Sequence, residues 1–266
     1  MRQARKELPA SLPRAIPALW WLPWSQFVTM NFSFAFLHAE MRAYSAQQFP
    51  EEACGLIVND KFIPCKNVHS APLTNFAIDA KAYAKAEKKG TIQAIFHSHP
   101  GELNTFSQHD VASCKESNLP WVMYCTVTDE WFEIDPSGNA PYIGRPWQYG
   151  IYDCYSLFRD FYCREFGIVL DDFSRGEEGE WTSPEWRMFE KNVEKQGFVD
   201  IEGPMQRGDM LLMQMQSSFI NHAGFIAVPE RNIFYQHLTD RLSDEHVYGG
   251  YWAKVTNRIM RHRELL

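Results

Sequence analysis

The segment from residue 96 to residue 110 constrains the fold most strongly, because it joins a buried strand to side chains that bind metals. An apolar run over residues 92–96 predicts a buried strand. His97 and His99 continue this run, and the alternation of side chains along a strand directs both imidazoles to one side. A proline and a glycine follow at once and end the strand. The sequence therefore predicts half of a metal site at the end of this strand.

The other half of the metal site is predicted a few residues later. Ser107 is a suitable N-cap for a helix that begins at the next residue. Asp110 then lies in the first helical turn, near the end of the strand that carries His97 and His99. Two histidines and one aspartate give three protein ligands and leave one position open, which is typical of a catalytic zinc site.

A proton carrier for this site is predicted upstream, at Glu52, which ends a helical segment and precedes an apolar strand. The motifs Glu52-x-Cys-Gly, His97-x-His99-Pro and Ser107-x-x-Asp110 resemble the JAMM (MPN+) metalloprotease signature. The resemblance implies that one zinc ion is bound by His97, His99 and Asp110. It also implies that Glu52 handles the proton and that Ser107 helps to stabilise the oxyanion.

A second candidate site lies in the C-terminal half. Apolar residues recur at helical spacing over residues 152–166, with Cys154 at the start of the helix, where the helix dipole favours a thiolate. His222 begins a predicted strand and is the candidate base. A group that orients its imidazole is expected on the following strand, where Gln236 and His237 are adjacent, so that only one of them faces the site.

The motifs of this half resemble the NlpC/P60 cysteine peptidases, which have a papain-like fold. They are Asp153-Cys154, Gly208-Asp209 and His222-Ala-Gly. Many members have Asp-Cys-Ser-Gly where this chain has Asp-Cys-Tyr-Ser, a change that keeps the nucleophile. The resemblance implies Cys154 as nucleophile and His222 as base. Because a second histidine is a familiar partner in that family, we predict His237 as the third group.

The order of the two motif sets resembles the tail tip assembly protein K family of lambda-like phages. The resemblance implies an α/β JAMM (MPN, cytidine-deaminase-like) domain over residues 31–140 and an α+β papain-like NlpC/P60 domain over residues 141–266. A turn-rich stretch from Pro136 to Gly150 is the expected linker. The acidic stretch 171–200 is either an inserted helix that lines the groove or a solvated connection with two core tryptophans, and we favour the second.

Other elements are predicted from periodicity and turn residues. Helices are expected over residues 34–49 and 80–89, and a hairpin turn at Asn59-Asp60. Paired strands are expected over residues 121–128 and 131–134.

Composition excludes some classes of function. The formal net charge is −7 and neither half of the body is basic overall, so nucleic-acid binding is not expected. No apolar stretch of about 20 residues predicts a membrane span. Residues 1–30 are basic and then apolar, which fits a secretory signal, an interfacial anchor, an unstructured extension, or translation from upstream of a true start at Met30. We favour one of the last two.

The two resemblances together imply a hydrolase with two peptidase sites. The C-terminal site is expected to cut peptidoglycan stem peptides, and the zinc site to cut a separate amide or isopeptide. The implied partners are other phage tail-tip proteins, and the implied location is the virion tail tip or the host cytoplasm during assembly. The alternative is a structural tail-tip component that has lost both activities.

Overall fold

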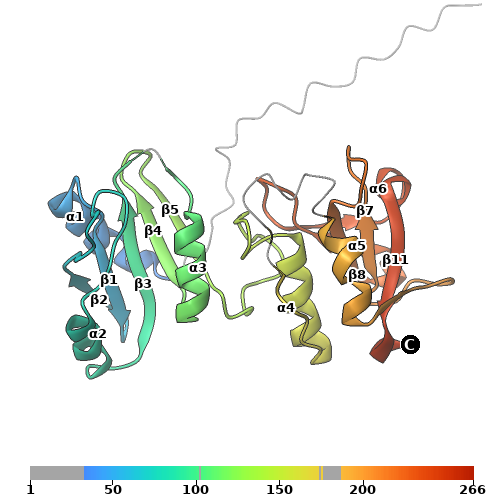
Figure 1. The fold of residues 1–266 in the computed structure, drawn as a ribbon, viewed down its shortest axis with the longest axis horizontal. Helices are drawn as coiled ribbons and strands as arrows, with labels where there is room; N and C mark the ends of the chain where they lie inside the picture. Colours follow the sequence, from blue (N-terminus) through green and yellow to red (C-terminus); the bar gives the residue numbers. More distant parts are fainter. Residues whose placement is uncertain (1–32, 102, 174, 176–186) are drawn as a thin grey trace, which may run out of the picture. The chain divides into compact units, whose positions relative to one another are not determined.

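The computed structural model describes residues 33–266, apart from residues 102, 174 and 176–186. The predictions for residues 1–30 and for Trp181 and Trp186 lie outside the described residues. Two β-sheets follow one another along the chain, each with its own helices (Figure 1). No helix in the described part of the chain has the length and apolar character needed to cross a membrane.

The first sheet has five strands in the order β2-β1-β3-β4-β5. Only β3 and β4 run parallel, and the other neighbours are antiparallel. The strands are β1 (Cys54–Val58), β2 (Lys61–Cys65), β3 (Ile92–His99), β4 (Trp121–Cys125) and β5 (Glu130–Ile134). The helices of this part are η1 (Ala35–Leu37), α1 (His38–Gln48), α2 (Ala80–Glu87) and α3 (Gln108–Ser117).

The β1–β2 hairpin confirms the predicted turn. Asn59 and Asp60 both have positive φ, 48° and 60°, which matches the tight turn that the right-handed twist of a hairpin favours. Gly55 of the Glu-x-Cys-Gly motif packs closely against the facing strand. A Cβ at this position would lie 2.3 Å from Phe62 Cε2 and 2.8 Å from the Ile63 carbonyl oxygen, so no side chain fits there.

Both faces of the first sheet are covered. Met41 of α1 is buried with Ile57 and Phe96 on one face, and Val111 of α3 lies in the cluster on the other. Tyr152 belongs to this second cluster, and its hydroxyl accepts a hydrogen bond from the Asp135 N–H at 2.7 Å. Tyr152, two residues after the expected linker, is therefore part of the core of the first sheet.

The second sheet has six antiparallel strands in the order β10-β9-β8-β7-β11-β6. They are β6 (Phe198–Asp200), β7 (Met210–Met213), β8 (His222–Val228), β9 (Ile233–Gln236), β10 (Asp244–Val247) and β11 (Thr256–His262). The helices are α4 (Cys154–Phe166), α5 (Met188–Asn192) and α6 (Tyr251–Val255), with 3-10 turns η3 (Glu194–Gln196), η4 (Pro229–Arg231) and η5 (Arg263–Leu265).

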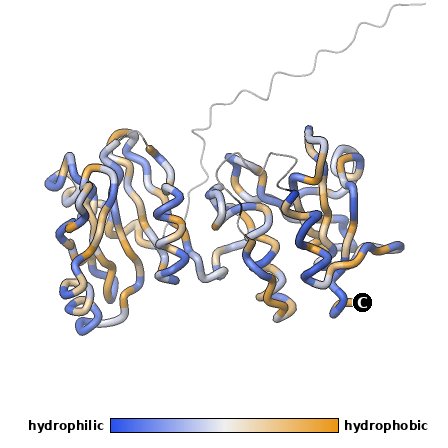
Figure 2. Tube along the Cα trace, in the orientation of Figure 1, coloured by the Kyte–Doolittle hydropathy of each residue, from blue (hydrophilic) through white to orange (hydrophobic). Residues whose placement is uncertain are grey.

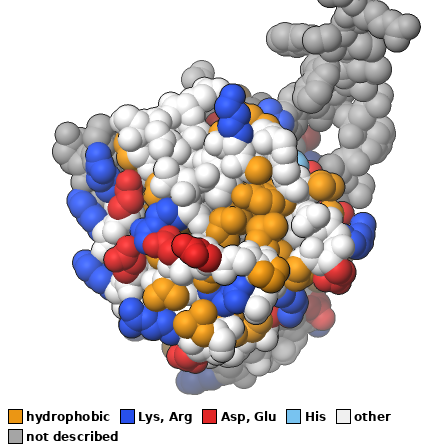
Figure 3. Space-filling model, turned by 90° about the vertical axis from the view of Figure 1, so that its right-hand side faces the viewer, with side chains coloured by type: hydrophobic (Ala, Val, Ile, Leu, Met, Phe, Trp, Pro, Cys, Tyr) orange, Lys and Arg blue, Asp and Glu red, His pale blue; other side chains and the backbone are white. Residues whose placement is uncertain are grey.

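Helix α4 covers one face of this sheet with aromatic side chains. Phe158 and Phe161 are buried against Phe225 of β8, with ring centroids 5.7 and 4.3 Å apart. On the other face, Phe234 packs against Trp252 of α6. Figure 2 shows hydrophobic and hydrophilic stretches along the trace of both sheets. The central strands β1, β4 and β7 are buried along their whole length, as strands covered on both faces require. Seen from the end that carries the second sheet, hydrophobic side chains also reach the surface among charged ones (Figure 3).

Candidate functional site

The predicted metal ligands come together at the end of β3. His97 and His99 lie on this strand and Asp110 in the first turn of α3, and all three are buried. One potential ligand atom from each lies within 4.8 Å of the others. The two Nε2 atoms are 3.1 Å apart, and they lie 3.6 Å and 3.4 Å from the Asp110 carboxylate oxygens. Three donor atoms therefore converge on one point, as binding of a single ion requires.

A capping box holds the aspartate in place. Ser107 is the N-cap of α3, as predicted, and its Oγ accepts a hydrogen bond from the Asp110 N–H at 3.1 Å. Asp110 Oδ2 in turn accepts from the N–H and the hydroxyl of Ser107, at 2.8 and 2.6 Å. The hydroxyl proton of Ser107 is thus directed at Asp110, so Ser107 could help to stabilise an oxyanion only by giving up this bond.

The imidazoles are oriented for metal binding. His99 Nδ1 donates to the Leu103 carbonyl at 3.1 Å, which leaves the lone pair on Nε2, toward the other two ligands. The His97 ring stacks on Phe76, with centroids 4.8 Å apart. Burial by itself raises the pKa of Asp110, but its close contacts with His97 and His99 and the hydrogen bond from Ser107 outweigh this effect and hold that pKa well below its usual range. Two imidazole nitrogens and an ionised carboxylate suit a borderline cation such as zinc.

Glu52 lies beside this cluster without belonging to the ligand set. Its N–H donates to the Pro72 carbonyl at 2.7 Å, and the next residue, Ala53, donates to Ser98 Oγ at 3.0 Å. Burial raises the pKa of Glu52 to about 7, while the charge of His99 opposes this rise and that of Asp110 adds to it. A carboxyl group with this pKa exchanges its proton readily near neutral pH.

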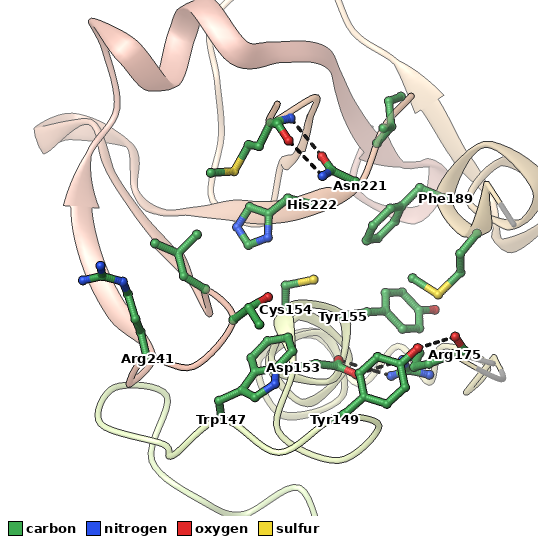
Figure 4. A pocket seen from close by; sticks show the side chains of 15 residues that line it. Trp147, Tyr149, Asp153, Cys154, Tyr155, Arg175, Phe189, Asn221, His222 and Arg241 are labelled. Carbon is green, nitrogen blue, oxygen red and sulfur yellow. Dashed lines mark hydrogen bonds and ion pairs between the residues drawn. The ribbon is translucent and has the colours of Figure 1, made fainter. Parts of the chain in front are cut away.

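The second site lies at the N-terminus of α4. Asp153 is the N-cap, and its Oδ1 accepts from the Ser156 N–H at 2.7 Å, so that Cys154 occupies the first helical position. Cys154 and His222 line the same cavity, which has a volume of about 310 Å³. Figure 4 shows the imidazole turned toward the end of α4 that carries Cys154. The structure thus brings together two residues that are 68 positions apart in the sequence.

The side chain that contacts the imidazole of His222 is Gln236 rather than His237. His222 Nε2 lies 2.9 Å from Gln236 Oε1, and because an amide oxygen only accepts, Nε2 carries the hydrogen and Nδ1 keeps the lone pair. The structure thus gives the predicted His237 no hydrogen bond to His222, and the role of either residue in catalysis stays a prediction. Strand β9 pairs Gln236 with Gly224, two residues beyond His222, so Gln236 points to the His222 side and its neighbour does not. His237 instead bonds the Arg241 carbonyl through Nε2 at 3.0 Å and packs edge-on against Trp147.

The pKa shifts at this site oppose the predicted thiolate. Burial, with the adjacent charge of Asp153, raises the pKa of the Cys154 thiol to about 12. Burial lowers the pKa of His222 to about 4. A neutral thiol and a neutral imidazole therefore face the cavity, rather than the thiolate expected at a helix N-terminus.

Several residues of this site were not singled out from the sequence. The cavity wall is largely apolar and includes Trp147, Tyr149, Phe189 and Leu238 (Figure 4). Arg175 also lines it and forms an ion pair with Asp153, at 3.0 Å. Gln236, by contrast, was already one of the two candidates for the third position. Arg175 offered no signal, because its partner is 22 residues away.

Comparison with known proteins agrees with this architecture. The model of prokaryotic homologs of the JAB domain matches residues 35–135, and that of the NlpC/P60 family matches residues 144–261. Tail tip assembly protein K of Escherichia phage N15 is 33% identical over 228 residues, which cover 84% of this chain and 93% of that protein. This chain belongs to the tail tip assembly protein K family. The predicted order of a JAMM domain and an NlpC/P60 domain is confirmed, whereas the boundary near residue 140 stays a prediction.

Two further relatives of this protein K family member are similar over shorter stretches. Tail tip assembly protein K of Escherichia phage lambda is 34% identical over 182 residues, covering 68% of this chain and 87% of that protein. A probable TtuB-protein conjugate cleaving protease of Thermus thermophilus is 33% identical over 96 residues, covering 33% of this chain and 64% of that protein. The domains and this relative indicate a hydrolase of the peptidase type.

Proposed function

We propose that this chain is a phage tail-tip protein with two peptidase sites, a zinc-dependent JAMM site and a cysteine peptidase site that hydrolyses peptidoglycan stem peptides. It acts in tail assembly, in penetration of the host wall, or in both, with other tail-tip proteins as partners. Its location is the virion tail, or the host cytoplasm during assembly. The family supports the tail assignment, since its members from phages N15 and lambda carry the name tail tip assembly protein.

The observation that carries the cysteine peptidase proposal is the His222–Gln236 hydrogen bond beside Cys154 in an open cavity. This bond leaves His222 Nδ1 free to accept the thiol proton as the sulfur attacks an amide carbonyl. The sulfur–carbon bond forms, the amide nitrogen takes the proton from His222 and leaves, and water then releases the acyl group. The N–H groups of Cys154 and Tyr155 at the start of α4 are suited to stabilise the oxyanion, since those of Ser156 and Leu157 donate to Asp153.

In the JAMM domain, His97 Nε2, His99 Nε2 and Asp110 would hold the zinc ion. When bound, zinc acts as a Lewis acid and lowers the pKa of water to about 7. Glu52 takes up and returns a proton at its carboxylate, for which a pKa of about 7 is well placed. Ser107 keeps Asp110 in position and, after breaking its bond to that carboxylate, stabilises the oxyanion. The substrate of this site is an amide or isopeptide, and a tail protein that requires maturation is our preferred candidate.

Release of muropeptides from purified peptidoglycan tests the proposal. The wild-type protein, Cys154→Ala and His97→Ala are compared, with Cys163→Ala as the matched control because Cys163 is exposed on the same helix. We expect release by the wild type, by Cys163→Ala and by His97→Ala, and none by Cys154→Ala. Equal release by Cys154→Ala, or no release by any version, contradicts the cysteine peptidase proposal.

A non-catalytic structural role is the second candidate. It is favoured by the names of the phage relatives, which refer to assembly alone. Complementation of tail assembly separates the two candidates: a chain that carries both Cys154→Ala and His97→Ala restores infectious tails if the role is structural, and fails if either activity is needed.

A further inference from the structure

The carboxylate next to the proposed nucleophile accepts hydrogen bonds at both of its oxygens. Asp153 is buried, and its two oxygens accept hydrogen bonds from the Ser156 N–H at 2.7 Å and from the Gly150 N–H at 3.1 Å. The third donor is Arg175, whose Nε lies 3.0 Å from Oδ2. A buried charge of this kind is stable only while its partners remain.

Several contacts hold the side chain of Arg175 in this position. Its side chain is 4% exposed, and Nη2 donates to Ser156 Oγ at 2.9 Å. Nη1 donates to Asp172 at 2.5 Å, and the guanidinium lies over the ring of Tyr155, 5.0 Å from the centroid. The guanidinium therefore contacts the N-cap and the first turn of α4 while it lines the cavity (Figure 4).

We propose that Arg175 is a positioning residue for Cys154, because it compensates the buried charge of Asp153 and thereby lets the thiol lose its proton to His222. This inference rests on the proposed role of Cys154 as nucleophile. It adds a residue that acts through Asp153 and does not touch the substrate.

The charges around Cys154 support this assignment. The titratable and charged groups that face the thiol or line its cavity are Asp153 at the N-cap of α4 and Tyr155 on α4, Tyr149 and Arg175 before and after that helix, His222 on β8, and Arg241 after β9. His237 lies next to this wall. The charge of Asp153 raises the pKa of the Cys154 thiol, and that of Arg175 lowers it. Among the described residues that line the cavity, Asp153 is the one carboxylate, so Arg175 is the cation placed to offset it.

Alkylation by iodoacetamide measures thiol reactivity without a peptide substrate. The rate at Cys154 is followed by mass spectrometry between pH 6 and pH 9 in the full chain, with the exposed Cys163 as internal reference. The variants are Arg175→Gln, Arg175→Lys and the double change Asp153→Asn with Arg175→Gln. Arg261→Gln is the matched control, since Arg261 forms a buried ion pair with Asp209, at 2.7 Å, and does not line the cavity.

We expect Arg175→Gln to slow alkylation of Cys154 at pH 7 by about tenfold or more relative to Cys163, since an uncompensated neighbouring carboxylate disfavours the thiolate. Arg175→Lys keeps the charge and restores part of the rate. The double variant recovers the wild-type rate because asparagine still caps the helix without a charge. Arg261→Gln leaves the ratio unchanged.

An unchanged rate in Arg175→Gln overturns the inference, and so does a double variant as slow as the single one, which would indicate a distorted helix. If Arg175→Gln fails to fold, the double variant decides, because it lacks the unpaired charge. If the wild type releases no muropeptide and yet its alkylation depends on Arg175 as described, the proposed function fails and this inference stands.

Discussion

Replacing Gln236 with alanine is the sharpest test of the cysteine site. Gln236 Oε1 accepts the hydrogen bond that fixes the His222 ring, at 2.9 Å, and both side chains are buried. The change leaves the backbone of β9 intact and removes this acceptor. It therefore tests the tautomer and orientation of the imidazole, and neither the nucleophile nor the base is altered.

The size of the effect follows from the burial of His222. A buried N–H that loses its acceptor costs about 1–3 kcal/mol. Since the ring must be held with Nδ1 toward Cys154 during proton transfer, most of this cost is expected in the transition state. At about 1.4 kcal/mol per factor of ten, kcat/KM should fall about 5- to 150-fold. Substrate binding by the apolar wall is untouched, so the loss should lie in kcat.

The assay is the initial rate of stem-peptide release, and His237→Ala is the matched control. His237 is the neighbouring residue on the chain, is equally buried, and does not bond His222. We expect it to lower stability while changing kcat much less than Gln236→Ala does. Gln236→Glu extends the test, because a carboxylate stabilises the imidazolium and should raise the pKa of His222 from about 4. The acid limb of the profile of kcat/KM against pH then moves to higher pH.

The opposite pattern refutes the reasoning. If His237→Ala abolishes turnover in a folded protein while Gln236→Ala is neutral, the imidazole is oriented by His237 in the active state. An acid limb that does not move in Gln236→Glu would show that residue 236 does not contact the base.

Three further predictions concern the metal and the stability of the fold. His97→Ala should lose bound zinc, measured by elemental analysis of dialysed protein, whereas the exposed His109→Ala keeps about one ion per chain; equal zinc content in both contradicts the ligand set. Burial lowers the pKa of His237 to about 4. As the pH falls, the unfolded state therefore binds the proton before the folded state does. The contribution of His237 to stability is complete above about pH 6.5 and is lost as the pH falls toward 4. In urea unfolding, the free energy of unfolding should be lower at pH 5 than at pH 7, with a contribution on the order of 2 kcal/mol from His237. His237→Gln should remove this contribution, and if the difference between the two pH values is unchanged in that variant, His237 is not buried as a neutral ring. Gly55→Ala should destabilise the protein by about 1–3 kcal/mol, measured by the same unfolding, because its Cβ would meet Phe62; a neutral result means that this ring can move.

The metal site could be predicted because its parts are local in sequence. Alternation places His97 and His99 on one side of β3, and the Ser107 cap fixes the phase of α3, so that Asp110 falls in its first turn. These relations depend on the periods of strand and helix and need no knowledge of the rest of the chain. The hairpin at Asn59-Asp60 was predictable for the same reason, since both residues tolerate positive φ.

The third group of the cysteine site depends on strand register, which the sequence leaves open. Gln236 and His237 are adjacent, and alternation requires that one of them faces away from His222. Which one does so is decided by the pairing of Gly224 with Gln236 between β8 and β9. A shift of one residue would exchange the two side chains, and nothing local distinguishes these registers.

The charge state of Cys154 shows how burial can outweigh a correct local argument. A helix N-terminus stabilises a thiolate by about 0.3–2 kcal/mol. Raising the thiol pKa from its usual value to about 12, as burial and Asp153 do here, corresponds to about 4 kcal/mol. The helix effect is present but smaller, and the burial that exceeds it arises from side chains distant in sequence. Burial therefore favours the neutral thiol, and in our proposal its reactivity depends on transfer of the proton to His222 and on the balance between Asp153 and Arg175.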